Sequence, residues 1–156
     1  MPEADVCSVD ALKDGEMRQV QVGETDVLLA RVDGHYHAVY GQCSHYGAPL
    51  ANGALSEGVV VCPWHHACFH LPTGDQVEPP GLDSLPRFNV REEDGRVIVR
   101  VPDDVAPMRI PEMARRRPDD ERTFVVLGAG SAGAYAVEAL RAAGYEGRLV
   151  MITKEA

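Results

Sequence analysis

The sequence lacks the features of a membrane or secreted protein. No window approaches the roughly 18 successive apolar residues of a membrane-spanning helix. The opening stretch MPEADVCSVD has neither the basic region nor the apolar run of a signal peptide. Cysteine is scarce too, with four in 156 residues, and a chain of this length can bury a core without a disulfide scaffold. We therefore expect a cytoplasmic protein with no membrane partner, in which neighbouring Cys and His residues bind a metal or act as redox groups.

Basic residues are also in deficit, and the formal net charge is -9. Residues 1–106 hold seven Lys and Arg against seventeen Asp and Glu, whereas the remainder is close to neutral. Because nucleic acid attracts basic proteins, this balance argues against a nucleic-acid partner. Two interpretations of the acidic surface remain open: a solubilising surface, or a face that docks against a basic redox partner.

Short apolar runs separated by turn signals dominate the first hundred residues. RQVQV, DVLLARV and HYHAVY follow one another, with the dipeptide Asp33-Gly34 before the third run, and RFNVREEDGRVIVRV contains Asp94-Gly95. Dipeptides of this kind between alternating runs predict β-hairpins with tight turns. We therefore expect a small antiparallel β domain over residues 1–105.

The composition changes after this domain. Residues 106–121 are rich in proline and charge and show no sustained period, which predicts a linker. Residues 122–156 then give a β-branched strand, a glycine-rich turn, an alanine-rich helix and another apolar strand. This order predicts the first β-α-β unit of an incomplete Rossmann-like domain, within a chain that is mainly β.

Four Cys and His residues form two pairs with distinctive spacing. Cys43 and His45 make a CxH pair, and after sixteen intervening residues Cys62 and His65 make a CxxH pair. Thiolates and imidazoles together can bind zinc or hold an iron-sulfur cluster with mixed ligands. Common zinc modules group Cys with Cys and His with His, whereas each loop here supplies one of each, which favours the cluster.

The loops CSHYGAPL and CPWHHACFHLPTGD resemble the two cluster-binding loops of the Rieske [2Fe-2S] family. The resemblance implies that Cys43 and Cys62 bind one iron, and that His45 and His65 bind the other iron, nearer to solvent. His66 stands beside His65 and leaves alternate ligation conceivable, but the resemblance assigns the ligand to the first of the two. With neutral imidazoles in place of thiolates the cluster is less negative, so an electron is easier to add.

Four positions depart from the high-potential branch of that family. In that branch, each loop carries an extra cysteine of a bridging disulfide, where this chain has Ala48 and Trp64. Hydroxyl groups of a serine and a tyrosine donate to the cluster and to a ligand sulfur, where this chain has Ala67 and Phe69, whose side chains cannot donate. We therefore expect a low-potential, ferredoxin-like cluster, in the lower half of the family range of about -150 to +300 mV.

The segment VVLGAGSAG places Gly128, Gly130 and Gly133 in GxGxxG spacing between a strand and a helix. In this context the motif predicts contact with a dinucleotide pyrophosphate. Glu155 follows the second strand, where its carboxylate could accept a hydrogen bond from a ribose hydroxyl. The segment looks like the FAD-binding entry of flavoprotein reductases. One β-α-β unit cannot enclose a flavin, so we expect weak or no FAD binding unless the full flavin domain is present.

The arrangement over nearly the whole chain resembles the Rieske-containing branch of the apoptosis-inducing-factor-like flavoprotein reductases. This implies a one-electron carrier in an FAD-dependent NAD(P)H oxidoreductase, with a flavin reductase domain or another redox protein as partner, and a chain that is an N-terminal fragment. We expect no NAD(P)H oxidation by this chain alone. Two alternatives remain: a stand-alone Rieske ferredoxin serving an aromatic-ring dioxygenase, and a structural zinc or partner-binding module without redox activity.

Overall fold

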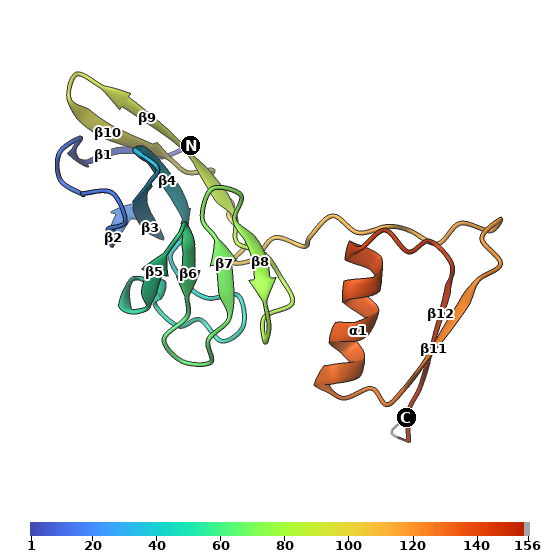
Figure 1. The fold of residues 1–156 in the computed structure, drawn as a ribbon. Helices are drawn as coiled ribbons and strands as arrows, with labels where there is room; N and C mark the ends of the chain where they lie inside the picture. The colour runs from blue at the N-terminus through green and yellow to red at the C-terminus, as the bar shows by residue number, and fades with distance from the viewer. Residues whose placement is uncertain (155–156) are drawn as a thin grey trace. The chain divides into compact units, whose positions relative to one another are not determined.

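The computed structural model describes residues 1–154 and divides the chain into two compact units, Met1–Ile110 and Pro111–Ala156. Strands dominate the first unit, and the second contains two strands connected by an α-helix (Figure 1). None of the helices in residues 1–154 is long and apolar enough to cross a membrane. The chain is mainly β, as expected from the sequence, and the domain boundaries given above remain predictions.

The larger sheet of the first unit is antiparallel and has the strand order β1-β10-β9-β4-β3-β2. Its strands are β1 (Glu3–Ser8), β2 (Met17–Val22), β3 (Thr25–Val32), β4 (His35–Tyr40), β9 (Arg87–Glu93) and β10 (Arg96–Arg100). Asp33 and Gly34 have φ angles of 51° and 77°, and Asp94 and Gly95 have 50° and 73°. Two successive left-handed residues form the turn that suits the twist of a hairpin, so both predicted hairpins are confirmed.

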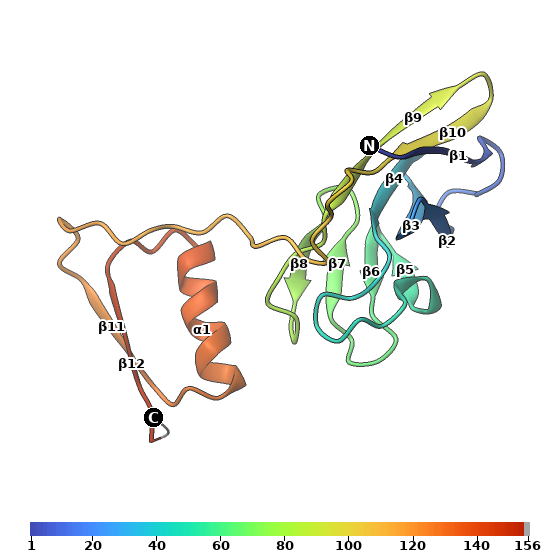
Figure 2. The ribbon, with the colours of Figure 1, turned by 180° about the vertical axis from the view of Figure 1, so that it is seen from behind.

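The smaller sheet is antiparallel, with the order β5-β6-β7-β8. Its strands, with the 3-10 helix before them, are η1 (Leu50–Asn52), β5 (Ala54–Ser56), β6 (Val59–Val61), β7 (Cys68–His70) and β8 (Asp75–Glu78). Residues 43–48, named here the first Cys/His loop, lie between β4 and η1. Residues 62–67, the second Cys/His loop, join β6 to β7. Figure 2 shows both loops at the same end of this sheet.

Strand β3 separates two apolar cores and is buried on both faces. Leu28 and Ala30 pack into one core, Val27 and Leu29 pack into the other, and all four side chains are 0% exposed. Since successive side chains of a strand point to opposite faces, a continuous apolar run is what such a strand requires. The core on the Leu28 side also contains the thiols of both Cys/His loops, so the hydrophobic interior directly supports the candidate site.

In the second unit, β11 (Thr123–Leu127) and β12 (Arg148–Ile152) pair in parallel, and α1 (Ser131–Ala142) connects them. Gly128 has a φ of 103°, a conformation that favours glycine. A Cβ atom on Gly133 would overlap the carbonyl oxygen of Gly128, so the helix can pack this closely on the turn only with glycine there. The order of elements is the one expected from the sequence.

Candidate metal centre

Equivalent backbone hydrogen bonds close the two Cys/His loops. The Cys43 N–H donates to the Ala48 carbonyl at 2.9 Å, and the Cys62 N–H donates to the Ala67 carbonyl at 2.9 Å. Both alanines are buried, at 1% and 0% exposure. Each loop therefore begins at a buried cysteine and returns to the core at an alanine five positions later.

A second pair of hydrogen bonds extends this equivalence. The N–H of Gly47 donates to the Cys43 carbonyl at 2.8 Å, and the N–H of His66 donates to the Cys62 carbonyl at 3.2 Å. Gly47 and His66 have φ angles of 74° and 63°. The left-handed conformation costs a residue with a side chain about 1–2 kcal/mol. His66 thus occupies a position that the equivalent loop gives to glycine.

The thiols of Cys43 and Cys62 are neighbours inside the protein. They are 3% and 1% exposed, and neither forms a disulfide. The pKa of Cys43 is raised to about 11, chiefly by burial and also by the adjacent Cys62 thiol, although the backbone N–H groups of His45 and Tyr46 act in the opposite direction. Thiolate is the form that binds metal, so positive iron and these N–H groups would together stabilise the buried charge.

The imidazoles of the two loops lie close together and nearer to solvent than the thiols. The ring centroids of His45 and His65 are 5.0 Å apart, with an interplanar angle of 80°. The Tyr46 ring contacts His45 at 4.4 Å and the Trp64 ring lies 6.5 Å from His65, and both aromatic side chains are exposed. The four predicted ligands are therefore brought together as a buried thiol pair and an outer imidazole pair.

This donor set fits a [2Fe-2S] cluster. Nδ1 of His45 is buried and has no hydrogen-bond partner among the described residues, so its lone pair is free to bind a metal. Within residues 1–154, no three His, Cys, Asp or Glu side chains are placed around one shared metal ion. A mixed-ligand [2Fe-2S] cluster takes two thiolates on one iron and two imidazoles on the other, and the structure groups the two thiols and the two imidazoles as separate pairs.

The other cysteines have different surroundings. The Cys68 thiol, 8% exposed, donates to the His66 carbonyl at 3.3 Å, and burial raises its pKa. Cys7 belongs to the other core.

Sequence reasoning did not single out Ser44, whose hydroxyl donates to the Asp83 carbonyl at 2.6 Å. Its position between two predicted ligands was the available signal.

The glycine residues predicted to bind a dinucleotide lie together in the second unit. Gly128 and Gly130 form the turn after β11, and Gly130 caps the start of α1, where its carbonyl accepts the Ala134 N–H at 3.0 Å. Gly133 lies within the first turn of the helix. Glu155, the predicted ribose contact, lies outside the described residues.

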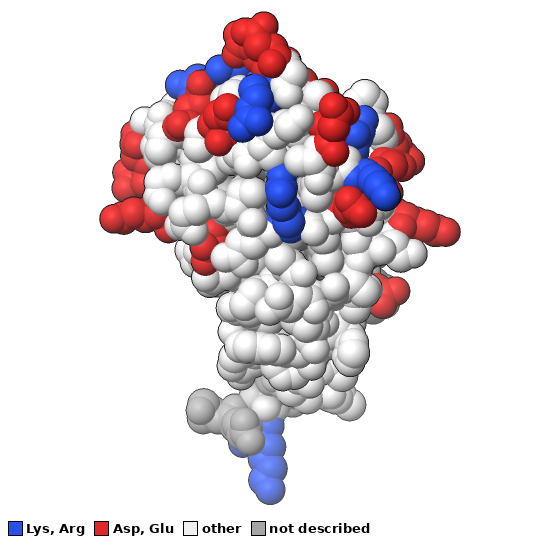
Figure 3. Space-filling view, turned by 90° about the vertical axis from the view of Figure 1, so that its left-hand side faces the viewer, with Lys and Arg blue, Asp and Glu red and all other residues white. Residues whose placement is uncertain are grey.

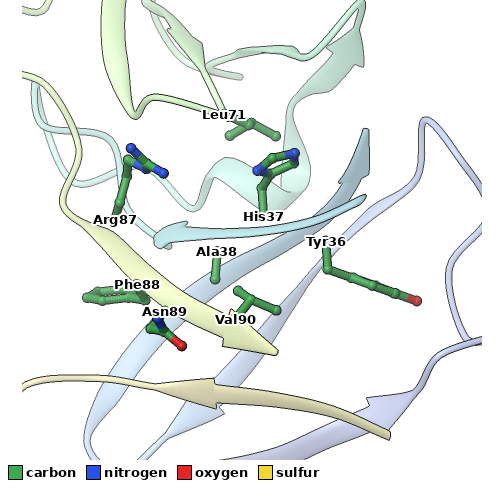
Figure 4. A pocket seen from close by; sticks show the side chains of 8 residues that line it. All are labelled: Tyr36, His37, Ala38, Leu71, Arg87, Phe88, Asn89 and Val90. Atoms are coloured by element: carbon green, nitrogen blue, oxygen red, sulfur yellow. The ribbon is translucent and has the colours of Figure 1, made fainter. Parts of the chain in front are cut away.

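A separate pocket of about 210 Å³ lies beside β4 and β9. In Figure 4, His37 and Arg87 project on the same side of these strands as Leu71. Burial lowers the pKa of His37, and the nearby Arg87 guanidinium lowers it further. The residues lining this pocket include none of the four candidate ligands, so it is a feature distinct from the metal centre.

The surface around the loops differs in charge from the rest of the first unit. Residues 41–53 and 58–72 contain no Lys, Arg, Asp or Glu. Figure 3 shows charged side chains gathered at the upper end of the view and an almost uncharged surface directly below them. The candidate site therefore lies in an uncharged part of an otherwise acidic unit.

Comparison with known families agrees with this site. The family profile described as the Rieske [2Fe-2S] domain matches residues 3–89. The chain belongs to this family, and its cofactor is a [2Fe-2S] cluster. The matched range contains both Cys/His loops. The match to this family and the similarity to its ferredoxin members support ferredoxin-like electron transfer as the activity.

Individual relatives fall into two groups. Apoptosis-inducing factor 3 of Mus musculus is 41% identical over 158 residues, which cover 97% of this chain and 26% of that protein. The ferredoxin component of the alkene monooxygenase system of Xanthobacter autotrophicus is 41% identical over 96 residues, 61% of this chain and 78% of that protein. The solved ferredoxin of Sphingomonas yanoikuyae B1 superposes with a TM-score of 0.60 at 28% identity, covering 64% of this chain and 99% of its own. The chain thus spans about a quarter of the length of the first group.

Proposed function

We propose that Cys43 and Cys62 hold one iron of the cluster, that His45 and His65 hold the other, and that the first unit carries one electron at a time. The bound cluster supplies the redox chemistry. The protein buries the two thiolates away from water and leaves the imidazole pair close to the surface. An electron can then pass at the imidazole edge without rearrangement of the fold.

We further infer that this carrier is a low-potential module of an FAD-dependent NAD(P)H oxidoreductase. The observation that carries this inference is the extent of similarity: the match to apoptosis-inducing factor 3 covers 97% of the chain, whereas the match to the alkene monooxygenase ferredoxin covers 61%. The glycine-rich turn of the second unit supports it as well. On this proposal Gly128, Gly130 and Gly133, with Glu155, begin a flavin site, and a flavin reductase domain is the redox partner.

The alternative function is that of a stand-alone ferredoxin for an oxygenase system. It is favoured by the ferredoxin components among the relatives and by the likeness of the first unit to solved ferredoxins. The matches to these proteins cover only 61% to 67% of this chain, against 97% for apoptosis-inducing factor 3, which is why we prefer the reductase module. A cytoplasmic location is proposed from the cysteine usage alone.

The ligand assignment is tested by substitution with matched controls. Cys62→Ser and His65→Ala should lose the visible absorbance of the cluster and its content of iron and sulfide, because each iron needs both of its protein ligands. Cys68→Ser and His66→Ala, which change the same residue types in or next to the same loop, should keep both. Retention of a full cluster in Cys62→Ser, or a colourless zinc-containing wild type, would overturn the assignment.

Two electron-transfer assays test whether the chain belongs to a flavoprotein reductase or to a dioxygenase system. The chain loaded with its cluster is first given NADH and a flavoprotein reductase, and then takes the place of the ferredoxin in an aromatic-ring dioxygenase system. We expect cluster reduction in the first assay and little dioxygenase turnover in the second. Turnover at the rate supported by the native ferredoxin would favour the stand-alone carrier instead.

A further inference from the structure

After β10 the chain does not leave the first unit at once. Residues 102–110, named here the strap, run to the segment that follows β8, where the Arg109 N–H donates to the Ser84 carbonyl at 2.8 Å. In return the Ser84 N–H donates to the Arg109 carbonyl at 2.9 Å. This reciprocal pair is an antiparallel β-bridge of a single residue on each side.

The side chain of Arg109 fastens the strap further. Its Nη2 atom donates to the Thr73 carbonyl at 3.2 Å and forms an ion pair with the Asp75 carboxylate, while Nε donates to the Leu85 carbonyl at 3.4 Å. Met108 and Ile110, on either side, are exposed. The attachment of this part of the strap therefore depends on Arg109.

The segment that Arg109 holds also supports the first Cys/His loop. Asp83, directly before Ser84, accepts the 2.6 Å hydrogen bond from the Ser44 hydroxyl. Ser84 and Leu85 are 1% and 0% exposed, and the Leu85 N–H donates to the Gly74 carbonyl at 2.7 Å. The path from the strap to the loop is thus short and partly buried, and it consists of these hydrogen bonds and the peptide link between Asp83 and Ser84.

We propose that Arg109 is a positioning residue for the cluster, which fastens the strap to residues 83–85 and through the Asp83 carbonyl holds Ser44 between the ligands Cys43 and His45. The inference rests on the proposed ligand assignment, because only then does Ser44 lie between two groups bound to iron. The strap continues into residues 111–121, so the same side chain ties the start of the linker to the cluster loop.

The test uses the full 156-residue chain loaded with its cluster. Arg109→Gln is compared with Arg91→Gln, which removes an arginine paired with Glu3 and Glu93 on the larger sheet. We expect Arg109→Gln to raise hydrogen exchange in residues 102–110 and at Ser84 about tenfold, and to shift the electron paramagnetic resonance spectrum of the reduced cluster. Arg91→Gln should do neither.

Coupling to the cluster is isolated by a double-mutant cycle with Ser44→Ala. If Arg109 acts through Ser44, Arg109→Gln should cause no further spectral shift in the Ser44→Ala background, although the strap still exchanges faster. Full additivity of the two spectral effects, or faster exchange with an unchanged spectrum, would refute the positioning role. Should Arg109→Gln fail to fold, Asp75→Asn removes the charge that pairs with Arg109 while leaving Arg109 itself in place, and the same two measurements are made on it. An error in the ligand assignment would show separately, as a cluster retained in Cys62→Ser.

Discussion

A hydroxyl group added at position 67 should raise the midpoint potential of the cluster. The Ala67 side chain is 0% exposed, and its backbone carbonyl already closes the second Cys/His loop through the Cys62 N–H. Ala67→Ser leaves that backbone bond in place and adds one donor in a position that water does not reach. The family resemblance places the donor of the high-potential branch at this position.

The size of the shift follows from the change in cluster charge. A hydrogen bond to a charged group contributes about 1.5–3 kcal/mol and one between neutral groups about 0.5–1.5 kcal/mol, so the reduced state gains about 1–1.5 kcal/mol more than the oxidised state. For one electron, about 1.4 kcal/mol corresponds to about 59 mV. We therefore expect Ala67→Ser to raise the potential by about 40–65 mV.

A redox titration followed by electron paramagnetic resonance measures this shift directly. Ala38→Ser is the matched control, since Ala38 is 3% exposed but lies in the other core, within β4. It should cost stability through an added buried hydroxyl without moving the potential. An unchanged potential in Ala67→Ser, an equal shift in the control, or a wild-type potential near the top of the family range would refute the reasoning.

Three further predictions concern the loops, the ion pair and the second unit. His66→Gly should raise the thermal stability of the cluster-loaded protein and Gly47→Ala should lower it, each by about 1 kcal/mol, since both residues are left-handed; a destabilised His66→Gly would contradict this. Burial alone would raise the pKa of Asp75, but hydrogen bonding and charge from Arg109 outweigh it and hold the pKa below its ordinary value of 3.8. The carboxylate therefore stabilises the fold above about pH 3.8, and this stability is lost as pH falls through the lowered pKa. In denaturant titrations between pH 2 and about pH 5, the free energy of unfolding of Asp75→Asn should therefore depend less on pH than that of the wild type. Gly133→Ala should destabilise the second unit by about 1–3 kcal/mol and reduce its helical circular dichroism, while cluster absorbance stays unchanged; loss of the cluster would show that the two units fold together.

The sequence predicted those features of the structure that depend on residues close together in the chain. The Asp-Gly dipeptides predicted two hairpins because a tight turn depends on a few adjacent residues. The CxH and CxxH spacings predicted the two candidate ligand loops for the same reason, because each pair lies within four residues. Strand β1 (Glu3–Ser8) was not anticipated, because its partner is β10 (Arg96–Arg100), and no adjacent residues announce such a distant pairing.

The equivalence of the two Cys/His loops was also missed. The histidine stands two positions after the cysteine in the first loop and three in the second, and His66 replaces the glycine that would have revealed the match. The signal available was the separation of five positions between cysteine and alanine, which Cys43–Ala48 and Cys62–Ala67 share. Likewise the bond from Arg109 to Ser84 joins segments far apart in sequence, and no composition rule predicts it.

The potential of this cluster should depend on its nearest donors more than on the acidic surface. The loop regions, residues 41–53 and 58–72, carry no ionised Asp, Glu, Lys or Arg. At physiological ionic strength the interaction between exposed charges is largely screened beyond about 8 Å. The backbone N–H groups facing Cys43 act at contact distance in a buried site, where electrostatic effects are stronger. Removing surface carboxylates should therefore matter less for the potential than one hydroxyl at position 67, although Glu78, which contacts Cys68 at 3.8 Å, is close enough to be the exception.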